Sequence, residues 1–195
     1  MAFVSFVQRA AAVEVVRNRN LRRAIGLGAF VALTAFGAHV AVPVPVSPVP
    51  VTLQTLFVIL AGAVLGPRLG AASQLAYLAL GAAGAPVFAG VFGMAALAGP
   101  TGGYLLAFPI AAALAGVAVR GGNRGALHAV RVGFGAIAAS AVILLIGALQ
   151  LTLYTGDFAN AVVAGVLPFL VGDALKAMIG ATIAVRLRKR TLGLF

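Results

Sequence analysis

Residues 132–154, VGFGAIAASAVILLIGALQLTLY, form an unbroken stretch without a charged side chain. A helix rises about 1.5 Å per residue, so this stretch is long enough to cross the roughly 30 Å hydrocarbon core of a bilayer. The whole chain has the same character, because 63% of its residues are hydrophobic and only 9% are charged. This composition excludes a soluble globular protein and predicts an all-α membrane protein. A β-barrel is disfavoured, because short segments of alternating polarity are absent.

Six apolar stretches of this kind follow one another along the chain. We expect membrane spans at about residues 24–41, 53–66, 69–84, 101–119, 132–154 and 167–185. The predicted organisation is therefore a basic N-terminal segment (1–23), a six-helix transmembrane domain (24–185) and a basic tail (186–195). The second and third spans are short, covering roughly 21–24 Å.

Basic residues outnumber acidic ones so strongly that the net charge is +11, which by itself would suit nucleic-acid binding. Their positions argue for membrane topology instead. With the N-terminus in the cytoplasm, all but one of the 14 Lys and Arg lie in cytoplasmic segments, and the three outer connections contain none. We therefore expect both termini in the cytoplasm, with the first span acting as the insertion signal in place of a cleaved signal peptide. The cytoplasmic cations are Arg9, Arg17, Arg19, Arg22, Arg23, Arg68, Arg120, Arg124, Arg131, Arg186, Arg188, Lys189 and Arg190.

Two of the predicted outer connections are apolar but cannot be regular helices. Residues 42–52, VPVPVSPVPVT, contain four prolines, which predict an extended segment. Residues 85–104, APVFAGVFGMAALAGPTGGY, are interrupted by Gly and Pro. Irregular backbone at membrane depth is tolerated where protein buries it or where it lines a cavity. We expect irregular outer loops that cap a binding site; the alternative is two apolar loops lying on the outer surface.

The remaining cation lies in the last span, in LVGDALKAMIG, residues 170–180. Asp173 and Lys176 are three residues apart and so share one face of a helix. Each charge near the centre of a membrane helix costs about 2.5–3.5 kcal/mol, so both side chains should face the bundle interior. Two interpretations remain: the charges only neutralise each other, or they bind a small polar head group enclosed by apolar walls.

Catalytic and metal-binding motifs are not evident. The sequence has no cysteine, and its two histidines, His39 and His128, have no partner ligand at metal-binding spacing, so no metal site is expected. No nucleophile-elbow serine and no phosphate-binding loop occurs. We expect that the chain is not an enzyme, and that any ATP-driven transport would use ATPase activity from another chain.

Small residues repeat every four positions along the first span, at Ala24, Gly28 and Ala32. This spacing lets another helix approach closely, and in lipid such packing drives association. The contact could be made with a partner protein or within the same bundle.

Several longer strings together resemble the BioY family, the biotin-specific substrate-binding components (S components) of energy-coupling factor (ECF) transporters. These are residues 44–90, VPVSPVPVTLQTLFVILAGAVLGPRLGAASQLAYLALGAAGAPVFAG, residues 99–116, GPTGGYLLAFPIAAALAG, and residues 168–177, PFLVGDALKA. The resemblance implies a six-helix bundle with one high-affinity vitamin site near the outer face. It also implies the bacterial inner membrane as location, biotin as ligand and no cofactor. The expected partners are a transmembrane coupling protein and two ATPase subunits.

The resemblance also assigns candidate roles to individual residues. Asp173 is expected to accept from the ureido N–H groups of biotin, and Lys176 to donate to the ureido oxygen or to the acidic tail. Further hydrogen bonds are expected from Gln54 and Thr52, and apolar walls from Tyr77, Phe88 and Tyr104. Ala24, Gly28 and Ala32 would contact the coupling protein. The competing hypotheses are a small intramembrane lipid-modifying enzyme, a transporter subunit for another small vitamin, and a passive channel.

Overall fold

The computed structural model describes residues 18–120 and 125–191, with side chains up to residue 186. Of the cations assigned to the cytoplasm, Arg9, Arg17 and Arg124 therefore lie outside the described residues. The elements are α2 (Arg19–His39), β1 (Ala41–Val42), β2 (Val51–Thr52), α3 (Gln54–Leu65), α4 (Pro67–Ala82), α5 (Met94–Ala98), α6 (Gly102–Arg120), α7 (Ala126–Thr155), α8 (Phe158–Gly165), a 3₁₀ turn η1 (Leu167–Phe169) and α9 (Leu170–Thr191).

The described chain is mostly helical, and each predicted span overlaps one helix: α2, α3, α4, α6, α7 and α9 in turn. Four helical stretches of the described residues are long and apolar enough to cross a membrane: Arg19–His39, Gly102–Arg120, Ala126–Thr155 and Phe158–Arg186. The helices α3 and α4 are shorter, with 12 and 16 residues. Their shortness agrees with the prediction for the second and third spans.

Several helices extend beyond the predicted apolar spans. α2 begins at Arg19, inside the predicted N-terminal segment, because Asn18 caps it and accepts from the backbone N–H groups of Asn20 and Leu21. Arginine is a good helix former, so charged residues can continue a helix that begins in the membrane. In the same way α7 begins at Ala126, and α9 continues to Thr191 within the predicted tail.

The predicted outer connections contain elements that the sequence patterns did not predict. The proline-rich segment folds back as a two-residue antiparallel ladder, in which Ala41 pairs with Thr52 and Val42 with Val51. Its four prolines lie between these strands, and because proline has no N–H it cannot extend the ladder. The segment is thus extended, as expected, but forms a hairpin. The short helices α5 and α8 interrupt the other two connections.

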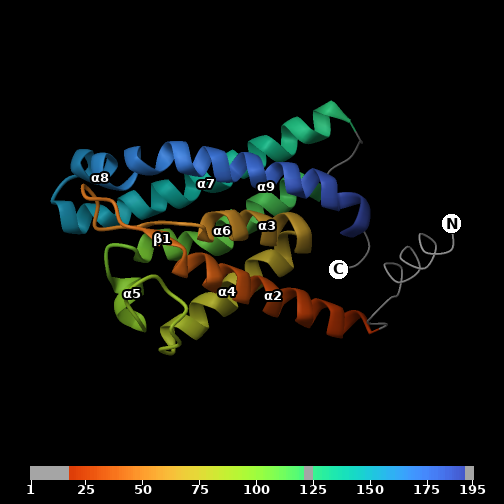
Figure 1. Ribbon diagram of the computed structural model, residues 1–195, viewed down its shortest axis with the longest axis horizontal. Helices are drawn as coiled ribbons and strands as arrows, with labels where there is room; N and C mark the ends of the chain where they lie inside the picture. The colour runs from red at the N-terminus through yellow and green to blue at the C-terminus, as the bar shows by residue number, and fades with distance from the viewer. Residues whose placement is uncertain (1–17, 121–124, 192–195) are drawn as a thin grey trace, which may run out of the picture.

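The elements separate to opposite ends of the bundle (Figure 1). The hairpin, α5 and α8 lie at one end, on the left of the figure, whereas the first turn of α2, the first turn of α7 and the last turn of α9 lie at the other. The apolar connections thus gather at one end of the molecule. The helix ends that carry basic residues gather at the other.

Glycines allow the short helices to pack closely on α6. A Cβ atom on Gly62 of α3 would lie 1.9 Å from the carbonyl oxygen of Ala112 in α6, and one on Gly116 of α6 would lie 2.5 Å from the nitrogen of Pro67. Gly66 joins α3 to α4 with a φ of +83°, a conformation that glycine adopts easily, and Pro67 starts α4. The L-G-P-R-L-G block at residues 65–70 therefore builds a tight, closely packed helical hairpin.

Candidate binding site

A cavity lies beneath the irregular connections and encloses the charged pair. It holds about 560 Å³ of space free of protein atoms, including the part open to solvent. Its lining comes from the hairpin and α3 (Val49, Pro50, Thr52, Gln54, Thr55), the connection after α4 (Phe88, Ala89), α6 and the residue before it (Thr101, Tyr104, Leu105, Phe108), α7 (Ile143, Leu144), and η1 with α9 (Phe169, Asp173, Lys176).

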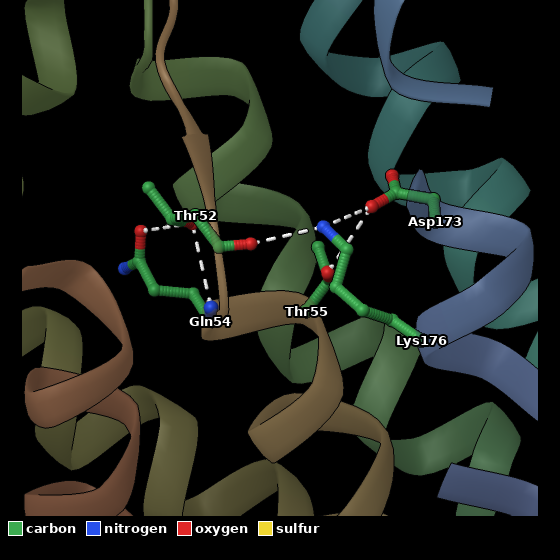
Figure 2. A network of polar contacts seen from close by, with 5 residues as sticks. All are labelled: Thr52, Gln54, Thr55, Asp173 and Lys176. Atoms are coloured by element: carbon green, nitrogen blue, oxygen red, sulfur yellow. Dashed lines mark hydrogen bonds and ion pairs between the residues drawn. The ribbon is translucent and has the colours of Figure 1, made fainter. Parts of the chain in front are cut away.

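Asp173 and Lys176 line this cavity and are almost completely buried, with 3% and 7% of their surface exposed. The Lys176 Nζ lies 2.5 Å from the Asp173 Oδ1. Each charge also has a second contact (Figure 2): Lys176 donates to the backbone oxygen of Thr52 at 2.9 Å, and the Thr55 hydroxyl donates to Asp173 Oδ1 at 3.2 Å. The pair is therefore tied to the hairpin and to α3 and is not bonded solely to itself. Within the described residues these contacts engage one carboxylate oxygen and two of the three ammonium donors, which leaves bonding capacity for a ligand.

The start of α9 differs from the predicted span. The 3₁₀ turn takes up residues 167–169, and α9 begins at Leu170, so Asp173 lies in its first turn instead of six residues in. A carboxylate in the first turn of a helix is favoured by the helix dipole. The 3₁₀ turn thus leaves the carboxylate closer to the N-terminal end of α9 than the sequence pattern indicated.

Thr52 and Gln54 join the hairpin to the wall of the cavity. The Thr52 hydroxyl donates to Gln54 Oε1 at 3.0 Å, Gln54 Nε2 lies 2.7 Å from the Tyr77 hydroxyl, and that hydroxyl donates to the backbone oxygen of Val87 at 2.8 Å. Thr52 and Gln54 both line the cavity. Tyr77 is fully buried and stands behind the lining, where its ring packs edge-on against Phe88 at 5.3 Å. Tyr77 therefore does not form the cavity wall itself but packs behind Phe88, which does.

Phe88 and Tyr104 both line the cavity, and each ring rests on glycine. A Cβ atom on Gly81 would lie 2.0 Å from the Phe88 ring, and one on Gly147 of α7 would lie 2.3 Å from the Tyr104 ring. The Tyr104 hydroxyl also donates to the backbone oxygen of Gly165 at 2.8 Å. Each ring thus packs directly against a glycine, and any residue with a Cβ atom at that glycine position would clash with the ring.

Some lining residues were not predicted from the sequence. The sequence could have indicated Thr55, because it lies in the same P-V-T-L-Q-T block as Gln54. In the structure its hydroxyl donates to Asp173. Phe169 directly precedes α9 and packs near Tyr104, with ring centroids 6.2 Å apart. Phe108 lies one turn after Tyr104 on α6. Their apolar spacing does not distinguish a cavity wall from core packing.

The small-residue stripe on α2 faces away from the bundle. Ala24, Gly28 and Ala32 are all exposed, and a Cβ atom on Gly28 would meet nothing within 4 Å. The interpretation of the stripe as a contact within the bundle is therefore not supported at Gly28 in the described residues. The stripe is available to another helix.

An apolar, glycine-shaped cavity with a buried carboxylate and ammonium defines a membrane-embedded binding protein for a small molecule with a polar head. Within the described residues no three His, Cys, Asp or Glu side chains gather as metal ligands would. The Asp–Lys pair is the chemical feature that distinguishes the site from ordinary packing.

Comparison with known proteins identifies the family. A family model described as the BioY family matches residues 9–192, and this chain belongs to that family. A probable biotin transporter BioY from Pyrococcus horikoshii is 48% identical over 83% of this chain and 93% of its own length. A biotin transporter BioY from Thermotoga maritima is 37% identical over 87% of this chain and 97% of its own length. The crystal structure of the S component for biotin from an ECF-type ABC transporter has a TM-score of 0.76 and 26% identity, covering 90% of this chain and 95% of that chain.

The buried pair can be tested without ligand by a double-mutant cycle. We expect Asp173→Leu and Lys176→Met each to lower the midpoint of thermal unfolding in detergent, because each leaves a buried charge unpaired at a cost of about 3–5 kcal/mol. The double variant should recover at least half of that loss, since it removes both charges. The measurement is the temperature at which half of the protein still elutes as a single species in gel filtration. Simply additive losses would contradict a direct interaction. The control is Asp157→Asn at the exposed start of α8, because asparagine caps a helix as well as aspartate does.

Proposed function

We propose that this chain captures biotin from the outer side of the membrane as the substrate-binding component of an ECF-type transporter. The observation that carries the proposal is the Asp173–Lys176 pair, which lines a mainly apolar cavity partly open to solvent and keeps bonding capacity on both charges. The names of the relatives support biotin as the ligand, and they favour transport over the alternative of an intramembrane enzyme.

The chemistry of biotin matches the polar end of the cavity. Its ureido group offers two N–H donors and one carbonyl acceptor, so the Asp173 carboxylate accepts from the N–H groups while the Lys176 ammonium donates to the ureido oxygen or to the tail carboxylate. The ligand then bonds the carboxylate oxygen of Asp173 and the N–H donor of Lys176 that the contacts within the described residues leave unused. Hydrogen bonds to charged groups are roughly twice as strong as those between neutral groups, which favours tight binding.

The bicyclic ring of biotin needs apolar contact on its faces. Phe88, Tyr104, Phe108 and Phe169 supply aromatic surface around the charged pair. Such rings bury large apolar areas and keep their orientation because they pack against glycine and against one another. Gln54 and Thr52 act at the polar end, and Tyr77 supports Phe88 from behind.

We also propose a six-span topology with both termini in the cytoplasm and the cavity facing outward. The distribution of Lys and Arg and the separation of basic helix ends from apolar connections support it (Figure 1). The short helices α3 and α4 then span only part of the bilayer, and the hairpin and α5 complete the outer half. The corresponding location is the cytoplasmic membrane, the inner membrane in bacteria.

The exposed α2 stripe is the proposed contact with a transmembrane coupling protein, which binds the ATPase subunits. Ala24, Gly28 and Ala32 present backbone-near surface that a second helix can approach closely. The structural relative is described as part of an ECF-type ABC transporter, which supports this assignment. No cofactor is required for ligand capture.

Titration calorimetry with purified protein tests the ligand and the site together. We expect saturable 1:1 binding of biotin, weakened by about 10–100-fold in Asp173→Asn, because a hydrogen bond to a buried charge contributes about 1.5–3 kcal/mol. Asp157→Asn is the matched control, since it makes the same exchange at the exposed cap of α8, outside the cavity lining. Equal affinity in both variants would refute the site assignment.

The same assay can locate the Lys176 contact. If the ammonium bonds the ureido oxygen, Lys176→Met should weaken biotin and biotinamide by the same factor. If it bonds the tail carboxylate, the substitution should weaken biotin much more than the uncharged amide. An unchanged affinity for both ligands would remove Lys176 from the site.

Cysteine labelling tests the topology, because the natural sequence contains no cysteine and gives a clean background. Val46 in the hairpin and Leu127 in the first turn of α7 are 68% and 78% exposed. A membrane-impermeant maleimide should label Val46→Cys in intact cells, and Leu127→Cys only after the cells are opened. The reverse pattern would invert the proposed orientation, and the cysteine-free protein should remain unlabelled.

A further inference from the structure

The connection between α4 and α6 forms part of the cavity wall but has almost no polar side chains. Residues 84–100, GAPVFAGVFGMAALAGP, contain none, while Phe88, Ala89 and the following Thr101 line the cavity. Side chains from other elements donate to several backbone carbonyls of this outer loop (residues 84–101). These hydrogen bonds therefore help to set the position of the outer loop relative to the cavity.

Helix α7 supplies donors to the part of the outer loop that contains α5. The last carbonyls of a helix have no partner within the helix, and α5 has only five residues. Gln150 Nε2 donates to the backbone oxygens of Leu97 at 2.9 Å and Gly99 at 2.8 Å. The hydroxyl of Tyr154 donates to the backbone oxygen of the residue between them, Ala98. Two side chains of α7 thus bond three consecutive carbonyls.

These two side chains belong to the face of α7 that also builds the cavity. Ile143 lines the cavity, Gly147 receives the Tyr104 ring, and Gln150 and Tyr154 bond the outer loop. Spacings of four, three and four residues keep these positions on one side of a helix. One face of α7 therefore contacts three parts of the site: the cavity at Ile143, the Tyr104 ring at Gly147, and the outer loop at Gln150 and Tyr154.

Glycine makes the approach of Gln150 possible. A Cβ atom on Gly102 would lie 1.8 Å from the Leu97 oxygen and 2.5 Å from Gln150 Nε2, and one on Gly103 would lie 2.8 Å from Gln150 Cβ. The paired glycines of the G-P-T-G-G-Y block thus leave room for this amide beside the loop. Neither Gln150 nor Tyr154 lines the cavity, so any effect on the ligand must pass through the loop.

The other end of the outer loop is bonded by one fully buried side chain, Tyr77, and by one exposed side chain, His39. The fully buried Tyr77 donates to Val87, and a ring nitrogen of His39 lies 3.1 Å from the oxygen of Pro86. The α7 contacts use no fully buried side chain, since Tyr154 is 49% exposed and Gln150 is only partly buried. Local opening favours the segment with fewer buried contacts. The α5 end is therefore the end that releases first.

We propose that Gln150 and Tyr154 are positioning residues that hold the α5 end of the outer loop against the ligand cavity and thereby set the rate at which biotin dissociates. This inference rests on the proposed function. Because the two side chains do not line the cavity, they act on how long the cavity stays closed. They do not determine which ligand it recognises.

The test compares Gln150→Leu, Tyr154→Phe and the double variant with Thr152→Val. Thr152 lies on the same helix, and its hydroxyl bonds only the Ala148 carbonyl of α7, so Thr152→Val removes a hydroxyl without touching the loop. Protein loaded with radiolabelled biotin is chased with excess unlabelled biotin. We expect the dissociation rate to rise about tenfold in the double variant and severalfold in each single variant, with no fall in the association rate. Thr152→Val should match the natural protein.

Hydrogen exchange in the ligand-free protein provides a readout that a general loss of stability would not reproduce. Exchange should accelerate at the backbone amides of residues 94–102 in the loop variants and remain unchanged in the hairpin, residues 41–52. Uniform acceleration, or an unchanged dissociation rate in variants that still bind biotin, would overturn the positioning role and leave the proposed function standing. Failure of the natural protein to bind biotin would instead refute the proposed function. If Gln150→Leu does not fold, Tyr154→Phe, which keeps its ring, decides the outcome.

Discussion

Two opposite charges inside a domain that otherwise excludes charge impose a constraint on the rest of this structure. Asp173 and Lys176 are stable there because each is bonded to the other and to a second group, the Thr55 hydroxyl and the Thr52 carbonyl. Replacing such a pair by apolar residues often costs nothing in stability, so stability alone does not account for its presence. The proposed ligand-binding role accounts for it, because the same contacts bring the hairpin, α3 and α9 together around the cavity.

That space exists because small residues and large rings alternate around it. Gly81 accommodates the Phe88 ring, and Gly147 accommodates the Tyr104 ring, so both rings pack into space that these glycines leave free. Close packing elsewhere has the same origin, since Gly62 and Gly116 let α3 and α4 lie directly on α6. Membrane helices lack a hydrophobic driving force for association and rely on such contacts. The glycine content of the chain is therefore part of how the site is built.

The sequence patterns predicted the helical membrane fold and the buried charge pair for physical reasons that hold over long distances. Apolar length and the cost of a charge in lipid do not depend on detail, so the predicted spans overlap helices, and Asp173 and Lys176 face the interior. Local geometry was harder to predict. Cap residues moved the start of α2, a 3₁₀ turn moved the start of α9, and two short helices formed in connections with no periodic signal. Tyr77 and Gln150 show the same limit, because only the fold reveals which buried polar group bonds a neighbouring carbonyl.

The most direct measurement of the central claim is a crystal structure of this protein grown with biotin. The account predicts ureido nitrogens within hydrogen-bond distance of the Asp173 carboxylate, with the Lys176 ammonium bonded to an oxygen of the same ligand and the bicyclic ring between the aromatic walls. Biotin bound away from this cavity, with the Asp173–Lys176 contact and its two threonine partners unchanged, would contradict it.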